Sequence, residues 1–213
     1  MKKKIMVVIL LLLGLGLTLL IFTILSGIKA TKAQTRFPEK PSVYRSALEA
    51  YKVIEPTMRE WNDDAYVVNI SAPLWWVDSP EWEVQPDGRV AWWMITVVSP
   101  SAESVTQISL VDDHIVVGVD GIPGEERPSS GKGVAISVDA MLDSIDAIQI
   151  SREIGIETSL YGMQIGRYDN DAGKAIPLSW IMKYRLSEGG VAKVYIDIVT
   201  GEVIRNDFLA PLN

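Results

Sequence analysis

The chain has no cysteine and a single histidine, His114, among its 213 residues. Without cysteine it can form no disulfide, no thiolate metal site and no lipid anchor of the kind that is attached to a cysteine. With one histidine it can build neither a serine–histidine–aspartate triad nor a two-histidine metal site, unless other residues substitute. We therefore predict that the protein is not an enzyme and has no catalytic residues, no cofactor and no metal site. A pair of carboxylates could still catalyse hydrolysis, but no spacing among the acidic residues singles out two of them.

Long apolar runs are absent except at the N-terminus, where residues 5–28 form 24 positions without a charge. A helix of that length extends about 36 Å at about 1.5 Å per residue, enough to cross a hydrocarbon layer of about 30 Å. The run is longer than the apolar region of a cleavable signal peptide, and residues 31–33 are only a passable cleavage site. We therefore predict a retained transmembrane anchor within residues 1–30, with removal of this segment as the alternative.

Positive charge is scarce outside the N-terminal part of the chain. Residues 1–45 carry eight Lys and Arg against one acid, whereas residues 46–213 carry 12 Lys and Arg against 26 Asp and Glu, a net charge of −14. Three lysines directly before the apolar run are typical of an export signal, so we place the body outside the cytoplasm of a single-pass protein of the cell membrane. Residues 31–45 form a basic juxtamembrane linker, and the acidic body excludes nucleic-acid binding.

The body contains one module twice. At an offset of 88, the segment Gln107–Val116 lies over Tyr195–Ile204, and Ala91–Val98 lies over Ser179–Leu186. This alignment pairs Trp92 with Trp180. Further upstream, Ala65–Ile70 lies over Leu160–Ile165 at an offset of 95, which leaves seven extra residues in the first copy within Ala72–Gly88. The repetition predicts two lobes of similar fold.

Each copy is predicted to begin with one amphipathic helix. In the first copy, Ser46 and Glu49 form a possible capping box, and Pro56 is expected to kink the helix or to end it early. In the second copy, Ser137 is the expected N-cap. The apolar residues recur at helical spacing in both, and they are Leu48, Tyr51, Ile54, Met58 and Trp61 in the first and Val138, Met141, Leu142, Ile145 and Ile148 in the second.

Strand patterns with a period of two follow each helix. They cover residues 65–71, 90–98, 104–111 and 114–119 in the first copy and 159–167, 177–186, 191–198 and 202–207 in the second. Residues 121–136 are rich in Gly, Pro and Ser and are predicted to form a linker. The sequence therefore predicts an α+β protein with two tandem lobes, residues 46–120 and 137–213, each made of a helix packed on an antiparallel sheet.

The hairpin that closes the second copy resembles a known family. Tyr195, Asp197 and Val203, together with Thr200, Gly201 and Glu202, form a Y-x-D-x-x-T-G-E-V pattern that is similar to the PepSY-type domain, whose fold is cystatin-like. The resemblance covers about 70 residues of the second copy, and the first copy departs from it with Ser109 and Asp113 at two of the positions. It implies an extracytoplasmic protein of the cell envelope that binds or restrains a partner protein, such as a peptidase. It implies no catalytic residues.

Tryptophan is the residue type that stands out as a candidate for binding. Trp75, Trp76 and Trp82 lie among prolines in the inserted segment, and Trp93 neighbours Trp92 on a predicted strand, so that the two rings point to opposite faces. Exposed tryptophans beside prolines suit a groove for an extended peptide. We predict Trp75, Trp76, Trp82 and Trp93 as partner-binding residues. Burial of these rings under the insertion is the alternative interpretation.

The sequence thus predicts a membrane-anchored envelope protein with a non-enzymatic binding or regulatory role toward an envelope protein partner. Restraint of a peptidase is one form of that role. The alternative function is a cell-wall glycan-binding module that uses the same tryptophans as stacking platforms.

Overall fold

The computed structural model describes residues 40–73, 82–119, 122–128, 133–156, 160–166, 177–187 and 189–208. Phe37–Asn213 forms one compact unit. The predicted anchor at residues 5–28 and two of the candidate residues, Trp75 and Trp76, lie outside the described residues. Within the described ranges, no helix has both the length and the apolar character that crossing a membrane requires.

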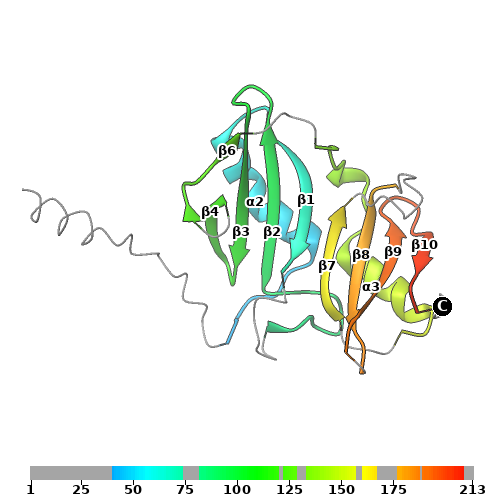
Figure 1. Cartoon of the computed structure of the whole chain (residues 1–213). Coiled ribbons are helices and arrows are strands. Elements are labelled where there is room, and N and C mark those ends of the chain that lie inside the picture. The colour runs from blue at the N-terminus through cyan, green and yellow to red at the C-terminus, as the bar shows by residue number, and fades with distance from the viewer. Residues whose placement is uncertain are drawn as a thin grey trace, which may run out of the picture. The chain divides into compact units, whose positions relative to one another are not determined.

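The described strands form one antiparallel sheet to which both copies contribute (Figure 1). The order across it is β10-β9-β8-β7-β1-β2-β3-β4-β5, with β6 paired to β3. The first copy supplies β1 (Tyr66–Ala72), β2 (Trp92–Ser99), β3 (Ser104–Val111) and β4 (His114–Val119). The second copy supplies β7 (Leu160–Gly166), β8 (Ser179–Arg185), β9 (Val191–Asp197) and β10 (Val203–Asn206). The predicted α+β class is confirmed, and the strands lie close to their predicted positions.

The two copies join through their first strands. β1 pairs with β7 in antiparallel orientation, with Ile70 opposite Ile165 and Ser71 opposite Gln164. Because equivalent strands pair antiparallel, the two copies are related by an approximate two-fold axis that passes through this pair of strands. The edge that each copy would otherwise expose at β1 or β7 is therefore covered by the other copy.

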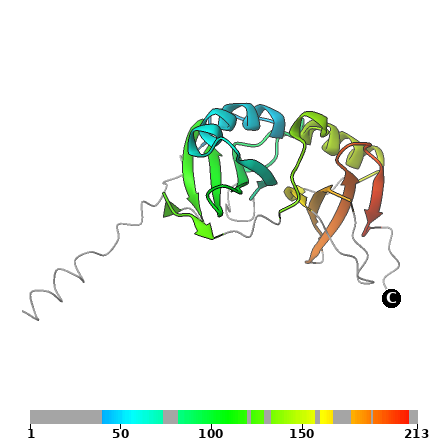
Figure 2. The same cartoon turned by 90° about the horizontal axis from the view of Figure 1, so that it is seen from above.

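The two α-helices of the described residues lie on one face of this sheet (Figure 2). They are α2 (Ala47–Trp61) and α3 (Ser144–Glu153), and a short 3₁₀ turn, η3 (Val138–Ala140), precedes α3. One apolar core lies between the helices and the sheet and takes residues from both copies, including Ile54, Ile95, Ile148 and Met182. The four side chains are between 0% and 5% exposed, so burial of apolar surface on this face is the main stabilising contribution.

The starts of the helices test the predicted caps. Ser46 caps α2 and forms the capping box with Glu49, as predicted. Pro56 lies inside α2 without ending it, because it is on the exposed side, where water can bind the carbonyl that a proline leaves without a donor. The prediction for Ser137 is wrong: this residue precedes only η3 and makes no capping hydrogen bond with its side chain. Asp143 caps α3 instead, in a capping box with Asp146.

Part of the segment that was predicted as a linker is ordered against the first copy. β5 (Ile122–Pro123) pairs with β4, and β6 (Arg127–Pro128) pairs with β3. The Ile136 N–H donates to the Val67 carbonyl at 2.8 Å, and the Ile136 side chain is buried in the core. The glycine and proline residues of this segment correctly indicated turns, but they gave no indication of its two short strands.

The N-termini of the two helices meet at the approximate two-fold axis. The Asp143 carboxylate accepts from its own helix at Ser144 N (2.7 Å) and from the other helix at Leu48 N (3.1 Å). The Ser144 hydroxyl accepts from Ala47 N at 3.0 Å. Each helix N-terminus carries a partial positive charge, so two facing N-termini repel each other. A single carboxylate shared by both offsets that repulsion.

Two tryptophans pack at the same place. Trp93 donates its indole N–H to the Arg45 carbonyl at 2.8 Å, and Trp180 donates to the Leu142 carbonyl at 2.9 Å. Each acceptor directly precedes a helix N-cap, so the two indoles occupy equivalent sites. Their rings meet edge to face with centroids 6.3 Å apart. The residue equivalent to Trp180 is therefore Trp93 and not Trp92.

The predicted alignment of Trp92 with Trp180 fails because the connections differ between the copies. β3 and β4 are joined by two residues, Asp112 and Asp113, whereas residues 198–202 join β9 to β10. No single offset can hold through connections of unequal length. Along a strand, an error of one residue moves a side chain to the other face of the sheet.

Candidate functional site

The described candidate tryptophans are buried and do not form a surface site. Trp93 is 0% exposed in the core, and Trp82 is 3% exposed. Trp82 belongs to a small separate cluster with Ala91, Trp92 and Val111, against which Tyr44 packs. The expectation that these two rings are presented to a partner is therefore wrong, because both are used in packing. Trp75 and Trp76 lie outside the described residues.

The turn around the single histidine is structural. The Asp112 carboxylate accepts from the backbone N–H of Val43 at 2.8 Å and also from Ser42, and Arg45 forms a salt bridge of 2.7 Å with Asp113. Partial burial alone would raise the pKa of Asp112, but these hydrogen bonds outweigh it and lower the pKa below its ordinary value. The turn thus holds the segment that leads into α2. Among the described residues, no group of three or more His, Asp and Glu side chains is placed to bind a metal ion.

The hairpin that carries the PepSY-type pattern is stabilised by its aspartate. The Asp197 carboxylate accepts from Val199 N and Thr200 N, both at 2.8 Å, and Gly201 adopts a φ of 74°. The hydrogen bonds from Thr200 and Val199 lower the pKa of Asp197 below its ordinary value. The residues of the pattern therefore form the end of β9, the turn and the start of β10, and Asp197 stabilises that turn.

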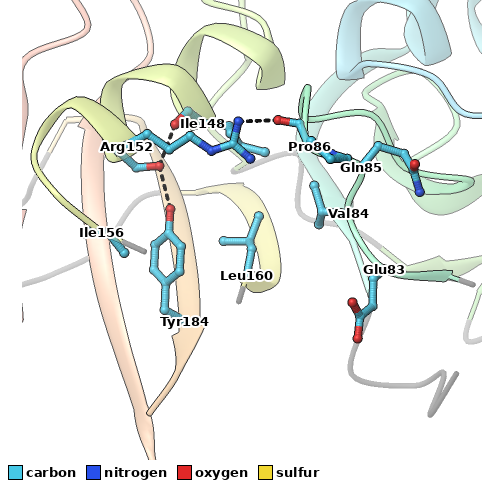
Figure 3. A pocket seen from close by; sticks show the side chains of 10 residues that line it. Glu83, Val84, Gln85, Pro86, Ile148, Arg152, Ile156, Leu160 and Tyr184 are labelled. Atoms are coloured by element: carbon cyan, nitrogen blue, oxygen red, sulfur yellow. Dashed lines mark hydrogen bonds between the residues drawn. The ribbon is translucent and has the colours of Figure 1, made fainter. Parts of the chain in front are cut away.

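A cavity of about 500 Å³ lies where the inserted segment of the first copy faces α3 of the second (Figure 3). One wall is the segment Glu83–Pro86. The other wall is formed by α3, by Ile156 after it, by the start of β7 and by the end of β8. Its apolar lining consists of Val84, Pro86, Ile148, Ile156 and Leu160. The rest of the lining carries polar groups, from Glu83, Gln85, Ser151, Arg152 and Tyr184. A volume of about 300–1,000 Å³ is typical of ligand sites in proteins.

Two hydroxyl groups lie within the cavity and satisfy each other. Tyr184 donates to the Ser151 hydroxyl at 2.6 Å, and Ser151 donates to the Ile148 carbonyl at 2.8 Å (Figure 3). Burial raises the pKa of Tyr184 and outweighs the opposite effect of its hydrogen bond to Ser151, so the phenol is neutral at physiological pH. Ser151 has no neighbouring base among the described lining residues, so nothing there activates it as a nucleophile.

Opposite charges mark the two ends of the cavity. Arg152 reaches from α3 across to the Pro86 carbonyl, to which it donates a hydrogen bond, and Glu83 lies at the end away from it (Figure 3). Both side chains are exposed to solvent. Among the described residues that line the cavity, Arg152 is the only cation and Glu83 the only anion. The arrangement can bind an elongated group that is apolar in the middle and polar at both ends.

Gly88 holds the inserted segment against α3. Its φ is 92°, its N–H donates to the Gln85 carbonyl at 2.9 Å, and its own carbonyl accepts from the Ser144 hydroxyl at 3.3 Å. A Cβ at this position would lie 3.1 Å from the Ile145 Cα and 3.2 Å from the Ser144 carbonyl oxygen. Only glycine combines this backbone conformation with so close an approach to the helix.

Replacing Gly88 by alanine is therefore expected to destabilise the fold twice over. The left-handed conformation costs about 1–2 kcal/mol for a residue with a Cβ, and displacement of the segment from α3 adds to it. The matched control is Gly124→Ala, since Gly124 has a φ of 74° and nothing within 4 Å of the added Cβ. Urea unfolding of both variants measures the difference. Equal losses of stability would contradict the close packing of the Gly88 segment on α3.

Sequence reasoning did not identify the residues of this cavity. It did find the insertion within Ala72–Gly88, from which one wall is built, but took its tryptophans as the contact residues. Arg152 and Tyr184 lie outside the insertion, on an ordinary helix and an ordinary strand. The insertion interrupts the repeat, and this feature could have pointed to the site. The sequence does not show that the insertion faces α3 of the other copy.

Comparison with known proteins gives little further information. No family model matches the sequence, and no curated protein matches it. A solved structure to which the chain is similar is that of a predicted lipoprotein from Clostridium difficile 630, with a TM-score of 0.44 and 8% sequence identity over 73% of this chain and 90% of that chain. A similarity this low assigns neither a family nor a function. The PepSY-type resemblance therefore stays a prediction from the hairpin pattern.

Proposed function

We propose that this chain is a membrane-anchored extracytoplasmic protein that binds a polypeptide partner without catalysing a reaction on it. The cavity between Glu83–Pro86 and α3 is the proposed binding site. The observation that carries the proposal is the combination of about 500 Å³ of space, a lining in which five of ten residues are aliphatic, and a charged group at each end. Restraint of a peptidase, which the PepSY-type resemblance implies, is one form that this binding can take.

A binding role fits the chemistry of the cavity better than a catalytic role. Its hydroxyl groups on Ser151 and Tyr184 are occupied with each other and with a backbone carbonyl. His114, the single histidine of the chain, lies at the start of β4 and does not line the cavity. The aliphatic part of the lining can hold an aliphatic side chain, and the polar part can orient the main chain that carries it.

Site-specific photo-crosslinking from the cavity tests this proposal. A photoreactive amino acid replaces Val84 in the full chain in intact cells, and a second form carries it at Val199, which is 60% exposed and does not line the cavity. We expect one main protein adduct from position 84 and no such adduct from position 199. The purified partner is then expected to bind the full chain.

The same binding is expected to disappear when the cavity is filled. Leu160→Trp replaces an aliphatic side chain of the cavity wall by a larger indole ring, whereas Val199→Trp places an indole ring on the surface. Circular dichroism checks that both variants are folded. Equal crosslinking from the two positions, or unchanged partner binding by the folded Leu160→Trp variant, would contradict this site.

A further inference from the structure

The guanidinium of Arg152 lines the cavity and has N–H donors that no described residue uses. Its side chain donates one hydrogen bond, to the Pro86 carbonyl, and it forms no salt bridge with any described residue. A guanidinium has five N–H donors in a planar fork, so most of them remain available. The bond to Pro86 restricts the long side chain before any ligand arrives, which reduces the entropy lost on binding.

Arg152 lies in a part of the chain that is acidic, since residues 46–213 carry a net charge of −14. Asp143, Asp146 and Glu153 lie on or next to the same helix. Arg152 forms no salt bridge with them and instead donates to the Pro86 carbonyl at the cavity (Figure 3). Because Arg152 lines the cavity, its remaining donors are within reach of a group that binds there.

We infer that the cavity recognises the C-terminal end of a polypeptide whose last residue is aliphatic, with the free carboxylate on Arg152 and the last side chain against Leu160, Ile156 and Val84. This inference rests on the proposed function and specifies the partner segment. The carboxylate and an aliphatic side chain are attached to the same carbon, so both can reach neighbouring parts of one small cavity. Arginine binds a carboxylate with two parallel hydrogen bonds, which fixes its direction as well as its position.

Glu83 then sets a preference further along the bound chain. It lies at the end of the cavity away from Arg152, so residues upstream of the C-terminus pass close to it (Figure 3). A basic side chain there is favoured and an acidic one is disfavoured, because the carboxylate attracts the first and repels the second. The neutral phenol of Tyr184 contributes no charge to either end.

Calorimetric titration of the full chain in detergent micelles tests the inference. The probes are a short peptide that ends in lysine-alanine-leucine with a free carboxylate, the same peptide with a C-terminal amide, and N-acetyl-leucine as a small free acid. We expect the amide to bind about tenfold more weakly than the acid, as loss of a charge-assisted pair predicts. Tighter binding of the peptide than of N-acetyl-leucine identifies a polypeptide end as the source of the carboxylate.

Variants assign the effect to the two charges. In Arg152→Gln the acid and the amide are expected to bind equally, whereas Arg185→Gln, which changes an arginine outside the cavity, keeps the tenfold preference. In Glu83→Gln the preference for lysine over glutamate at the upstream position is expected to disappear. A preference for the acid that survives Arg152→Gln would overturn the inference.

Two further outcomes separate this inference from the proposed function. If the wild-type chain binds the acid and the amide with equal affinity, carboxylate recognition is overturned. If Leu160→Trp still abolishes that binding, the cavity remains a polypeptide site. Failure of all three probes to bind overturns the inference, while the crosslinking from position 84 decides the proposed function independently.

Discussion

Replacing Trp93 by alanine is expected to lower the free energy of unfolding by about 3–5 kcal/mol, because large-to-small changes of a buried aromatic residue cost that much. The ring is 0% exposed and touches Trp180 at the point where the two copies meet. The loss combines the cavity left by the indole with an Arg45 carbonyl that no longer receives its hydrogen bond. Urea unfolding followed by circular dichroism measures it. A loss below about 1 kcal/mol would contradict the core position of this ring, since surface substitutions have effects of that size.

A double-mutant cycle shows whether the two tryptophans stabilise the joint between the copies. Trp180→Ala is expected to have an effect similar to that of Trp93→Ala, because Trp180 is equally buried and makes the equivalent hydrogen bond. The double variant is expected to lose less than the two single losses together, by about 0.5–1.5 kcal/mol for an edge-to-face pair. Strictly additive losses would mean that the ring contact contributes nothing.

Replacing Asp143 by alanine is expected to destabilise both helices although it is the N-cap of α3 alone. Loss of an N-cap costs about 1 kcal/mol, and a partly buried N–H left without an acceptor at Leu48 costs about 1–3 kcal/mol more. We therefore expect a total loss of about 2–4 kcal/mol. Hydrogen exchange is expected to become faster in the first turn of α2 as well as in α3.

Two controls separate the cap from general changes of charge. Asp143→Asn keeps an acceptor oxygen but removes the charge. Its loss of stability should therefore be about 0.3–1 kcal/mol, which is the contribution of a charge at a helix end. Asp63→Ala removes an exposed carboxylate that makes no side-chain hydrogen bond in the structure, and its effect should lie within about 0.5 kcal/mol of zero. Faster exchange confined to α3 in Asp143→Ala would contradict a shared cap.

Local patterns predicted the elements of this fold well. The helix of the first copy begins at its predicted capping box, and the strands follow the alternation of apolar residues. The failures concern quantities that depend on distant residues. Ser137 and Asp143 are both good cap residues, and the choice between them is set by contacts with Leu48 and with Gly88 of the other copy.

The face on which each tryptophan lies could not be read from the repeat. Trp92 and Trp93 are adjacent, and unequal connections between strands decide which of the two matches Trp180. The same limit applies to the site. Glu83 and Arg152 are far apart in the sequence, and only the pairing of β1 with β7 brings their elements to one cavity.

The joint between β1 and β7 has a consequence for how such a protein can diversify. Two identical subunits that paired in this way would form a symmetric dimer, in which every change to one interface residue occurs twice. In a single chain each copy can change alone, as the longer connection of residues 73–91 compared with 167–178 shows. The pairing of β1 with β7 is therefore free of the symmetry that a dimer would impose, so one copy supplies the wall Glu83–Pro86 of the cavity while the other supplies α3.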